Sequence, residues 1–287
     1  MTAPVLADAL GPRARRRVLI ASIVTGALLT GVLAIAVNRL GDKGQLSWDR
    51  WEPLTQWSVL KFLLGGLGLT AKAAATGMVG ALVLGTALAL LRLSRTGPIR
   101  WLATTWVEFF RGVPLLLLIF FTFFGLHRQG VDLSPFRALV IALALYNGAV
   151  LCEILRAGIL SLDRGQTEAA YTIGLDYWQA MRLVILPQAV RRMIPAIVSQ
   201  LITLLKDTSL GFVITYEELL RRSRSTGEFF KNPLQATALV ALVYIAVNLT
   251  LSRIARHLEV RQRRRLGAGP MTVGGVEDLT TVGLPQQ

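Results

Sequence analysis

The chain has 287 residues, of which 53% are hydrophobic and 17% charged, and its mean hydropathy is +0.53. So many apolar residues exceed the needs of a soluble core and indicate a membrane protein with several spans. The net charge of +14 comes with one cysteine and two histidines, which excludes an internal disulfide and a cysteine metal cluster and leaves a histidine-built metal site or catalytic dyad poorly supplied.

The first predicted span lies near the N-terminus. Residues 1–17 form a basic N-terminus, and residues 18–37 carry no charge. At 1.5 Å per residue this uncharged stretch crosses a hydrocarbon core of roughly 30 Å. A cleaved signal peptide is the alternative, but the apolar run is too long for a typical h-region. We therefore expect a retained additional helix, followed by an external segment, residues 38–61, with interfacial tryptophans at Trp48, Trp51 and Trp57.

The second predicted span covers residues 62–91 and carries a stripe of small side chains. Gly77, Ala81 and Gly85 fall four residues apart, so they lie on one face of a helix. Such a stripe lets another helix approach closely. We expect it to serve packing and not a ligand.

A bend is predicted before the third span. Residues 106–111 form a charged, aromatic lead-in, Gly112 and Pro114 then interrupt the chain, and residues 115–126 are apolar. Proline lacks a backbone N–H and restricts the residue before it, so the chain is expected to turn here.

The fourth predicted span, residues 136–156, contains ionisable side chains. Glu153 and Arg156 stand three residues apart and can pair on one helical face. An ionisable residue within a membrane helix is a functional candidate by default. A structural ion pair near the cytoplasmic end is an equally good interpretation.

A polar, helix-forming insert separates this span from the next. It covers residues 156–192, which is long for a connection without a function. We expect Thr167 to cap a first helix, Gly174 to make a bend, and a second helix to run from Asp176 until Pro187 stops it. A helix, a bend and a helix at a membrane face suit insertion into a groove on another protein.

The rest of the chain holds two further spans. Residues 194–215 are apolar apart from a few polar side chains, Lys206 and Asp207 among them, and each of these two charges needs its own partner or water. The loop 216–235 has mixed charges that suit a surface meeting a soluble protein, and a last apolar segment covers residues 236–252. The tail 259–287 is expected to be cytoplasmic and, from Gly267, disordered.

Lysine and arginine predict the orientation. They are about twice as frequent in the pieces assigned inside as in those assigned outside, which favours six spans with both termini cytoplasmic. The loop 216–235 is the exception, since it is basic and assigned outside. Basic residues at membrane edges attract anionic lipid, so membrane lipid is an expected partner and the net charge is explained without nucleic acid.

The insert also carries a resemblance. Its order of Glu-Ala-Ala, three residues, Gly, nine residues, Val, one residue and Leu-Pro is similar to the signature loop, the EAA motif, of membrane subunits of ATP-binding-cassette (ABC) importers. Val184 stands where the family has isoleucine. In the family this loop docks on the ATPase subunit and transmits its movement. The resemblance implies docking residues at Glu168, Ala169, Ala170, Gly174, Leu186 and Pro187.

Other segments resemble permeases for polar amino acids such as histidine, glutamine and glutamate. They are residues 108–114, with Val113 in place of threonine, residues 146–158, with Gly148 and Ala157 as departures, and residues 205–210. Residues 214–221 are similar to actinobacterial glutamate permeases. The candidate substrate path consists of Asn147, Glu153, Lys206, Asp207, Thr208 and Ser209.

The resemblance implies an all-α, type I importer transmembrane domain in the plasma membrane. A five-helix permease core, residues 62–258, would follow the additional N-terminal helix. The implied partners are an ABC ATPase, an extracytoplasmic solute-binding protein and a second permease subunit, identical or sister. The chain has no Gly-Lys dipeptide and hence no phosphate-binding P-loop, so ATP and Mg²⁺ are expected on the ATPase and no cofactor on this chain.

We therefore expect a permease that imports a polar amino acid, with glutamate as the best guess. An ion-coupled secondary carrier is the alternative and predicts uptake without ATP. A membrane receptor or scaffold is a further alternative and predicts no flux. A membrane enzyme fits least, because no nucleophile, base and orienting group recur at suitable spacings.

Overall fold

The structure, a computed structural model, describes residues 11–94 and 96–265. Every regular element in these ranges is helical, as the sequence predicts. Five helices are long and apolar enough to cross a membrane, and a bent helix pair brings the number to six if it counts as one span. The structure thus agrees with an all-α membrane protein of six predicted spans.

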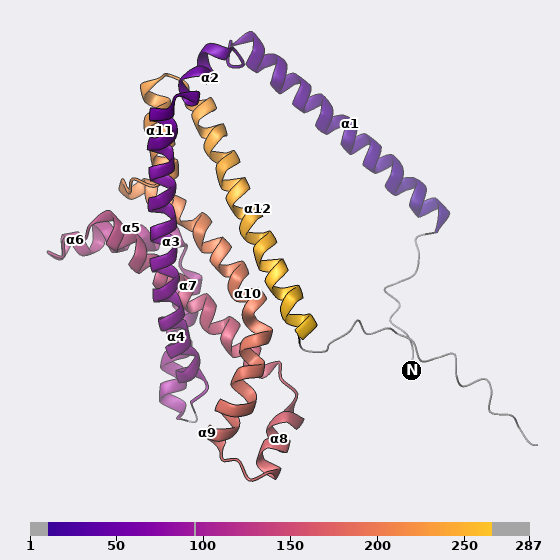
Figure 1. Cartoon of the computed structure of the whole chain (residues 1–287), viewed down its shortest axis with the longest axis vertical. Coiled ribbons are helices and arrows are strands. Elements are labelled where there is room, and N and C mark those ends of the chain that lie inside the picture. Colours follow the sequence, from indigo (N-terminus) through magenta and orange to yellow (C-terminus); the bar gives the residue numbers. More distant parts are fainter. Residues whose placement is uncertain (1–10, 95, 266–287) are drawn as a thin grey trace, which may run out of the picture.

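The helices follow one another with short connections (Figure 1). The α-helices are α1 (Pro12–Asp42), α2 (Trp48–Thr55), α3 (Trp57–Arg92), α4 (Gly97–Gly112), α5 (Leu115–Phe120), α6 (Leu126–Arg128), α7 (Pro135–Leu160), α8 (Arg164–Thr172), α9 (Tyr177–Ala180), α10 (Leu186–Asp207), α11 (Leu219–Phe229) and α12 (Pro233–Arg265). Two π-helical turns, η2 (Phe121–Gly125) and η3 (Met181–Ile185), and one 3₁₀ helix, η4 (Thr208–Ile214), complete them.

Helices α3 and α7 form the centre of the molecule. A Cβ added at Gly85 would lie 2.8 Å from the carbonyl oxygen of Gly148, and one at Gly77 would lie 3.2 Å from the Cβ of Leu143. The small residues of α3 therefore let the backbone of α7 come close, and Ala81 is fully buried among them. The predicted packing role of this stripe is confirmed.

The predicted bend separates α4 from α5. Val113 is extended, with φ −82° and ψ 127°, because Pro114 disfavours a helical conformation before it. The chain bends by 100° between the segments Gly97–Gly112 and Leu115–Arg128. The lead-in before the bend is thus part of a helix. Ala103 and Val107 are its buried residues and form its inner face.

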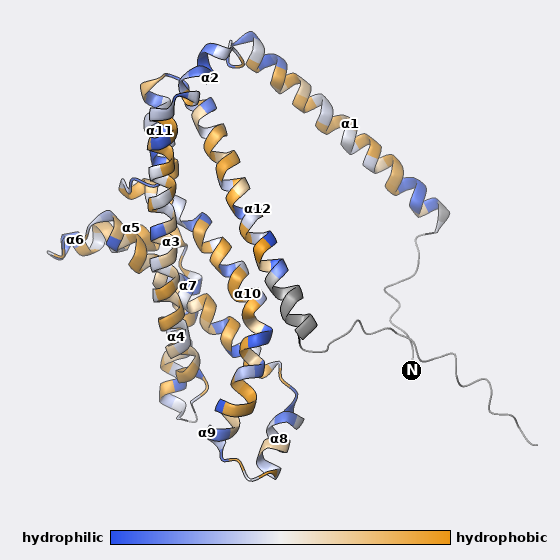
Figure 2. Ribbon diagram, viewed as in Figure 1, coloured by the Kyte–Doolittle hydropathy of each residue, from blue (hydrophilic) through white to orange (hydrophobic). Residues whose placement is uncertain are grey.

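Helix α1 projects away from the other helices (Figure 1), and its most apolar window has no buried residue. Hydrophobic residues lie along most of its length (Figure 2), and its large apolar side chains are exposed, which is typical of a helix surrounded by lipid. Its retention as an additional span stays a prediction.

The loop after η4 differs from the expected charged surface. Glu218 is fully buried, accepts hydrogen bonds from the backbone N–H groups of Leu220 and Arg221, and accepts another from the Tyr244 hydroxyl. Burial raises the pKa of the Glu218 carboxyl, and its hydrogen bonds partly oppose that rise. Glu218 thus caps α11 and ties it to α12, while Arg224 and Glu228 remain exposed.

The C-terminal boundary also differs from the prediction. Helix α12 continues to Arg265, past the expected core boundary at residue 258. The rest of the predicted tail, residues 266–287, lies outside the described residues. The end of α12 and the α8–α9 insert point toward the same end of the molecule, away from α2 and α11 (Figure 1).

Candidate functional site

Helix α7 continues to Leu160 and α10 begins at Leu186, so the insert is shorter than the predicted 156–192. Its first helix, α8, begins one turn earlier than predicted. Asp163 is its N-cap and accepts a hydrogen bond from the backbone N–H of Gly165 at 2.9 Å. The prediction of Thr167 as the cap was therefore wrong. The Asp163 carboxylate binds a free backbone N–H at the start of the helix, so the helix begins at Arg164. Thr167 and Glu168 therefore lie within it.

Gly174 makes the predicted bend. Its φ is +85°, which favours glycine because other side chains rarely adopt this conformation. The N–H of Gly174 donates to the Tyr171 carbonyl at 3.0 Å, and that of Leu175 donates to the Ala170 carbonyl at 3.2 Å. These two bonds form a Schellman motif, which ends α8 and reverses the chain.

The second helix starts where predicted but does not end there. Asp176 and Gln179 form a capping box, with hydrogen bonds of 2.8 and 2.9 Å. The helix then passes through the π-helical turn η3 and continues as α10, so the predicted stop at Pro187 was wrong. The wider turn directly before this proline accommodates its ring and its missing N–H without ending the helix.

Hydrogen bonds fasten the insert to the membrane helices. The Gln188 amide donates to the Gln166 side chain at 3.0 Å and so joins α10 to α8. The Arg192 guanidinium donates to the Ser161 carbonyl at 2.7 Å and joins α10 to the end of α7. Helix α10 is therefore bonded both to α8 and to the end of α7.

The predicted docking residues occupy different environments along this insert. Ala170 is 2% exposed and lies inside the helical hairpin, whereas Glu168, Ala169, Gly174, Leu186 and Pro187 are exposed. Apolar side chains beside them are also exposed, with Ile173 at 75% and Trp178 at 66%. The insert thus presents apolar surface that no other described part of the chain covers.

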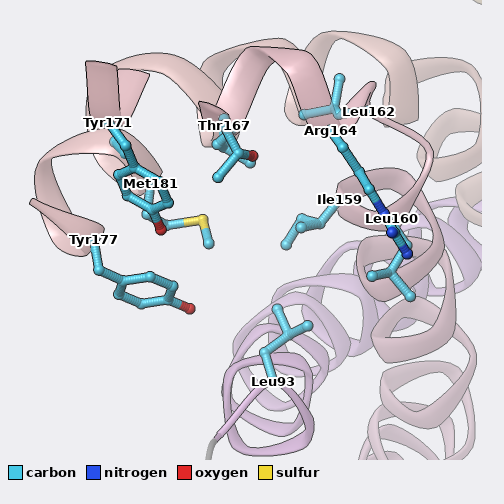
Figure 3. Close-up of a pocket in the computed structure, with 11 residues that line it drawn as sticks. Leu93, Ile159, Leu160, Leu162, Arg164, Thr167, Tyr171, Tyr177 and Met181 are labelled. Atoms are coloured by element: carbon cyan, nitrogen blue, oxygen red, sulfur yellow. The ribbon is translucent and has the colours of Figure 1, made fainter. Parts of the chain in front are cut away.

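A cavity of about 500 Å³ lies beneath the insert, between it and the ends of α3 and α7 (Figure 3). Leu93 and Ile159 face it from the membrane helices, and Thr167, Tyr171 and Met181 face it from the insert (Figure 3). The insert is therefore held off the bundle and does not pack flat against it.

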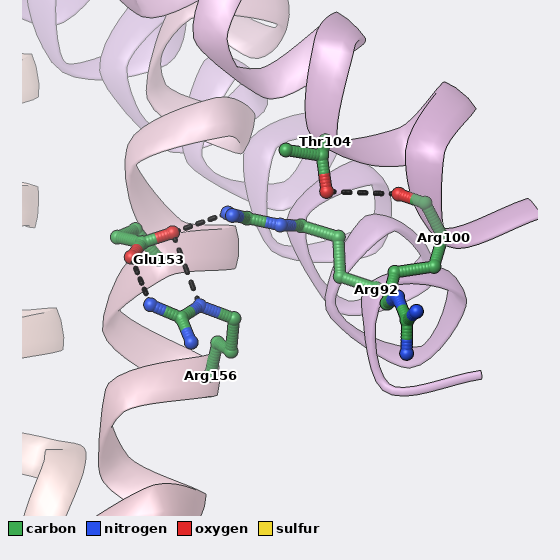
Figure 4. Close-up of polar contacts among 5 residues, drawn as sticks. All are labelled: Arg92, Arg100, Thr104, Glu153 and Arg156. Atoms are coloured by element: carbon green, nitrogen blue, oxygen red, sulfur yellow. Dashed lines mark hydrogen bonds and ion pairs between the residues drawn. The ribbon is translucent and has the colours of Figure 1, made fainter. Parts of the chain in front are cut away.

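Glu153 lies in a three-residue ion cluster (Figure 4). Arg156 donates to it with Nη2–Oε1 at 2.6 Å, which confirms the predicted pair. Arg92, at the end of α3, donates to the other carboxylate oxygen. Sequence reasoning missed Arg92, because it is far from Glu153 along the chain. The cluster links α3 to α7, so this structure places Glu153 in a cross-link, and its role in a substrate path stays a prediction.

Removing this carboxylate should destabilise the protein. Glu153→Gln leaves Arg92, which is 12% exposed, beside Arg156 without an anion, and should lower the free energy of unfolding by about 2–3 kcal/mol. Thermal unfolding in detergent measures this loss. Glu228→Gln is the control, because it breaks the exposed pair with Arg224 and should change little. Equal behaviour of the two variants would contradict a structural role for Glu153.

The other predicted path residues lie in two separate places. Asn147 is fully buried, and its side-chain oxygen accepts a 2.6 Å hydrogen bond from Gln200, which joins α7 to α10. The run from Lys206 to Ser209 lies where α10 changes into η4. Among the described residues, Lys206 and Asp207 have no ion-pair partner within 4.0 Å, and Glu153 pairs with Arg92 and Arg156 instead.

Within that run the side chains differ in exposure. The Thr208 hydroxyl is buried and donates to the Leu205 carbonyl at 2.7 Å. Lys206 and Ser209 line a cavity of about 330 Å³ between α10 and α12, together with Tyr244 and Asn248. The structure therefore does not bring all six predicted path residues together.

Known proteins are similar to this chain in sequence and in fold. Residues 81–264 match the family described as binding-protein-dependent transport system inner membrane component. The glutamate transport system permease protein GluD of Corynebacterium glutamicum is 38% identical over 236 residues, which cover 80% of this chain and 84% of that protein. The probable glutamine ABC transporter permease protein GlnP of Bacillus subtilis is 42% identical over 71% of this chain and 94% of its own length.

A solved structure of an amino acid transporter is also similar to this chain. The crystal structure of an amino acid ABC transporter with histidines superposes with a TM-score of 0.70 at 31% identity, over 72% of this chain and 97% of that one. The methionine transporter MetNI, at 18% identity and a TM-score of 0.58, shares the fold.

The fold, the insert and these matches together define a membrane permease. The chain belongs to the family of binding-protein-dependent inner membrane components, as an amino-acid permease subunit of an ABC transporter. It is a multi-pass protein of the cell membrane, and subunits of this kind are not enzymes themselves.

Proposed function

We propose that this chain forms half of the membrane channel of an ATP-driven importer for glutamate or a closely related polar amino acid. It would work with an ABC ATPase, an extracytoplasmic solute-binding protein and a second permease subunit, identical or sister. ATP and Mg²⁺ would bind to the ATPase and no cofactor to this chain. The exposed, firmly attached insert from α8 to η3 is the observation that carries this proposal.

The insert has the features that docking on a soluble subunit requires. Its apolar side chains, Ile173 above all, are exposed beside a bend with open space around Gly174. Closure of the ATPase pair would move two such inserts together. Helix α10 would follow through its bond to α8, and α7 would follow through its bond to α10. The helices would then tip from inward-open to outward-open, and the binding protein would deliver its solute. Glu168 and Gly174 act in this scheme through docking and not through chemistry.

The relatives support an amino acid as the solute. Their names specify glutamate in C. glutamicum, glutamate and aspartate in Escherichia coli O157:H7, and arginine in B. subtilis. Among these candidate solutes we favour glutamate, because residues 214–221 are similar to actinobacterial glutamate permeases. The cavity between α10 and α12 supports Lys206 and Ser209 as path residues, since a carboxylate can bind an ammonium group and a hydroxyl.

Uptake of radiolabelled glutamate tests this proposal. Cells that lack this chain and are complemented with it should take up glutamate, and excess unlabelled aspartate should compete better than arginine.

Lys206→Met should reduce glutamate uptake at least tenfold, because it removes the exposed cation from the cavity between α10 and α12. Arg191→Met removes another exposed cation of α10, outside that cavity, and is the control.

The energy source separates the alternatives. Uptake should stop when ATP is depleted and continue when a protonophore collapses the proton gradient. Uptake that follows the proton gradient would favour the secondary carrier. Intact protein in the membrane without any uptake would favour a receptor or scaffold.

A further inference from the structure

A second cavity, of about 600 Å³, adjoins the one beneath the insert. It shares four lining residues with that cavity: Leu93, Ile159, Tyr177 and Met181. Its other lining residues come from the end of α3, the start of α4, the α9–η3 segment and the first turn of α10. The volume falls within the range of ligand-binding pockets in proteins.

The lining of this second cavity is apolar and exposed. Leu91 is 45% exposed, Ile99 is 42% exposed and Leu186 is 40% exposed. Trp178 lines the cavity and is 66% exposed. Trp101, two residues after Ile99 on α4, is 69% exposed. Tryptophan is enriched where the hydrocarbon core meets the headgroups. These two exposed tryptophans therefore favour a position at the membrane edge for this cavity, next to the insert.

The charges around the two cavities have one sign. Arg182 lines the cavity at the membrane edge and Arg164 lines its neighbour, and both side chains are exposed. No Asp or Glu lines either cavity in the part of the chain that the structure describes, and neither arginine has an ion-pair partner within 4.0 Å among those residues. Cations at the rim and apolar walls inside are complementary to a molecule with an anionic head and a hydrocarbon tail.

We propose that an anionic phospholipid binds here, with an acyl chain between α3, α4 and α10 and its phosphate at Arg182, while Arg164 in the adjoining cavity adds positive charge. Such a lipid would lie between the insert and the bundle, in contact with the π-helical turn η3 through Met181. It would hold the insert at its distance from α3. The consequence for coupling to an ATPase rests on the proposed function, but the binding itself does not.

Lipid retention measured by native mass spectrometry tests this site. The purified permease with its co-purified subunits is exposed to phosphatidylglycerol or to phosphatidylcholine. The unmutated chain should retain one phosphatidylglycerol in preference to phosphatidylcholine. Arg182→Gln should weaken that retention about fivefold, because it removes the cation that lines this cavity near a membrane surface, and Arg164→Gln should weaken it less.

Two matched controls keep the test specific. Arg191→Gln removes an exposed cation from α10 outside both linings and should retain the lipid. Leu91→Trp fills the cavity and should abolish retention, whereas Val83→Trp adds the same ring at a position on α3 that is 68% exposed and outside the lining. Loss in both tryptophan variants would mean general disruption and would overturn the proposal.

Other outcomes also overturn the proposal. Equal retention of the two lipids would mean that headgroup charge is not recognised. Retention by the isolated permease that disappears in the complex would mean that the ATPase covers this cavity. Gly174→Asp should keep the lipid even if it loses the ATPase, so failure of lipid binding and failure of docking give different results.

Discussion

Gly174→Asp should abolish solute uptake while the protein still inserts into the membrane and folds. Gly174 lies at the exposed bend of the insert with φ +85°, and nothing lies within 4 Å of the place where a Cβ would stand. The substitution therefore leaves the packed helices untouched. It introduces a charge and a side chain at the surface that would enter the ATPase, and we expect uptake to fall more than a hundredfold, since an unpaired charge buried at an interface costs several kcal/mol. Uptake and the amount of membrane-inserted protein are measured together.

Gly130→Asp is the matched control for this variant. Gly130 has φ +81°, is exposed and also has nothing within 4 Å of the added Cβ, but it lies in the loop between α6 and α7. The backbone strain is thus the same in both variants. If uptake falls equally in both, strain is the cause and docking through the bend is contradicted.

Gly85→Val should have the largest effect on stability. Its Cβ would lie 2.8 Å from the Gly148 carbonyl oxygen and 2.9 Å from the Leu151 Cβ, at the closest approach of α3 to α7. Backbone atoms at this crossing cannot move aside without separating the two helices. Overpacking of this kind should cost about 3 kcal/mol and lower the Tm by roughly 6–12 °C.

Gly68→Val provides the comparison on the same helix. Nothing lies within 4 Å of a Cβ at Gly68, which is exposed, so its Tm should change by only about 2 °C or less. A similar loss in both variants would show that helix propensity, and not the α3–α7 contact, explains the effect. Thermal unfolding in detergent measures both.

Features set by neighbouring residues could be predicted from the sequence. Gly174 as a bend, Gly112–Pro114 as a break between helices and the pair of Glu153 with Arg156 depend on residues a few positions apart. So does the face shared by Gly77, Ala81 and Gly85. Local backbone chemistry and helical spacing decide each of them.

Features that depend on distant contacts could not be predicted. Arg92 joins Glu153 only because α3 and α7 pack together, and Glu218 is buried only because α11 lies against α12. The mixed charges around Glu218 suggested a surface loop instead. The sequence predicts that the helix ends at Pro187, because proline normally breaks a helix and the π-helical turn before it has no clear sequence pattern.

Co-purified ATPase activity tests the central claim most directly. The chain is isolated from its own membranes under gentle extraction, with Gly174→Asp and Gly130→Asp alongside, and ATP hydrolysis is measured in each preparation. The unmutated chain and Gly130→Asp should carry an ATP-hydrolysing subunit, and Gly174→Asp should not. If intact, unmutated protein carries no ATPase, the insert is not a docking element and the importer mechanism proposed here is contradicted.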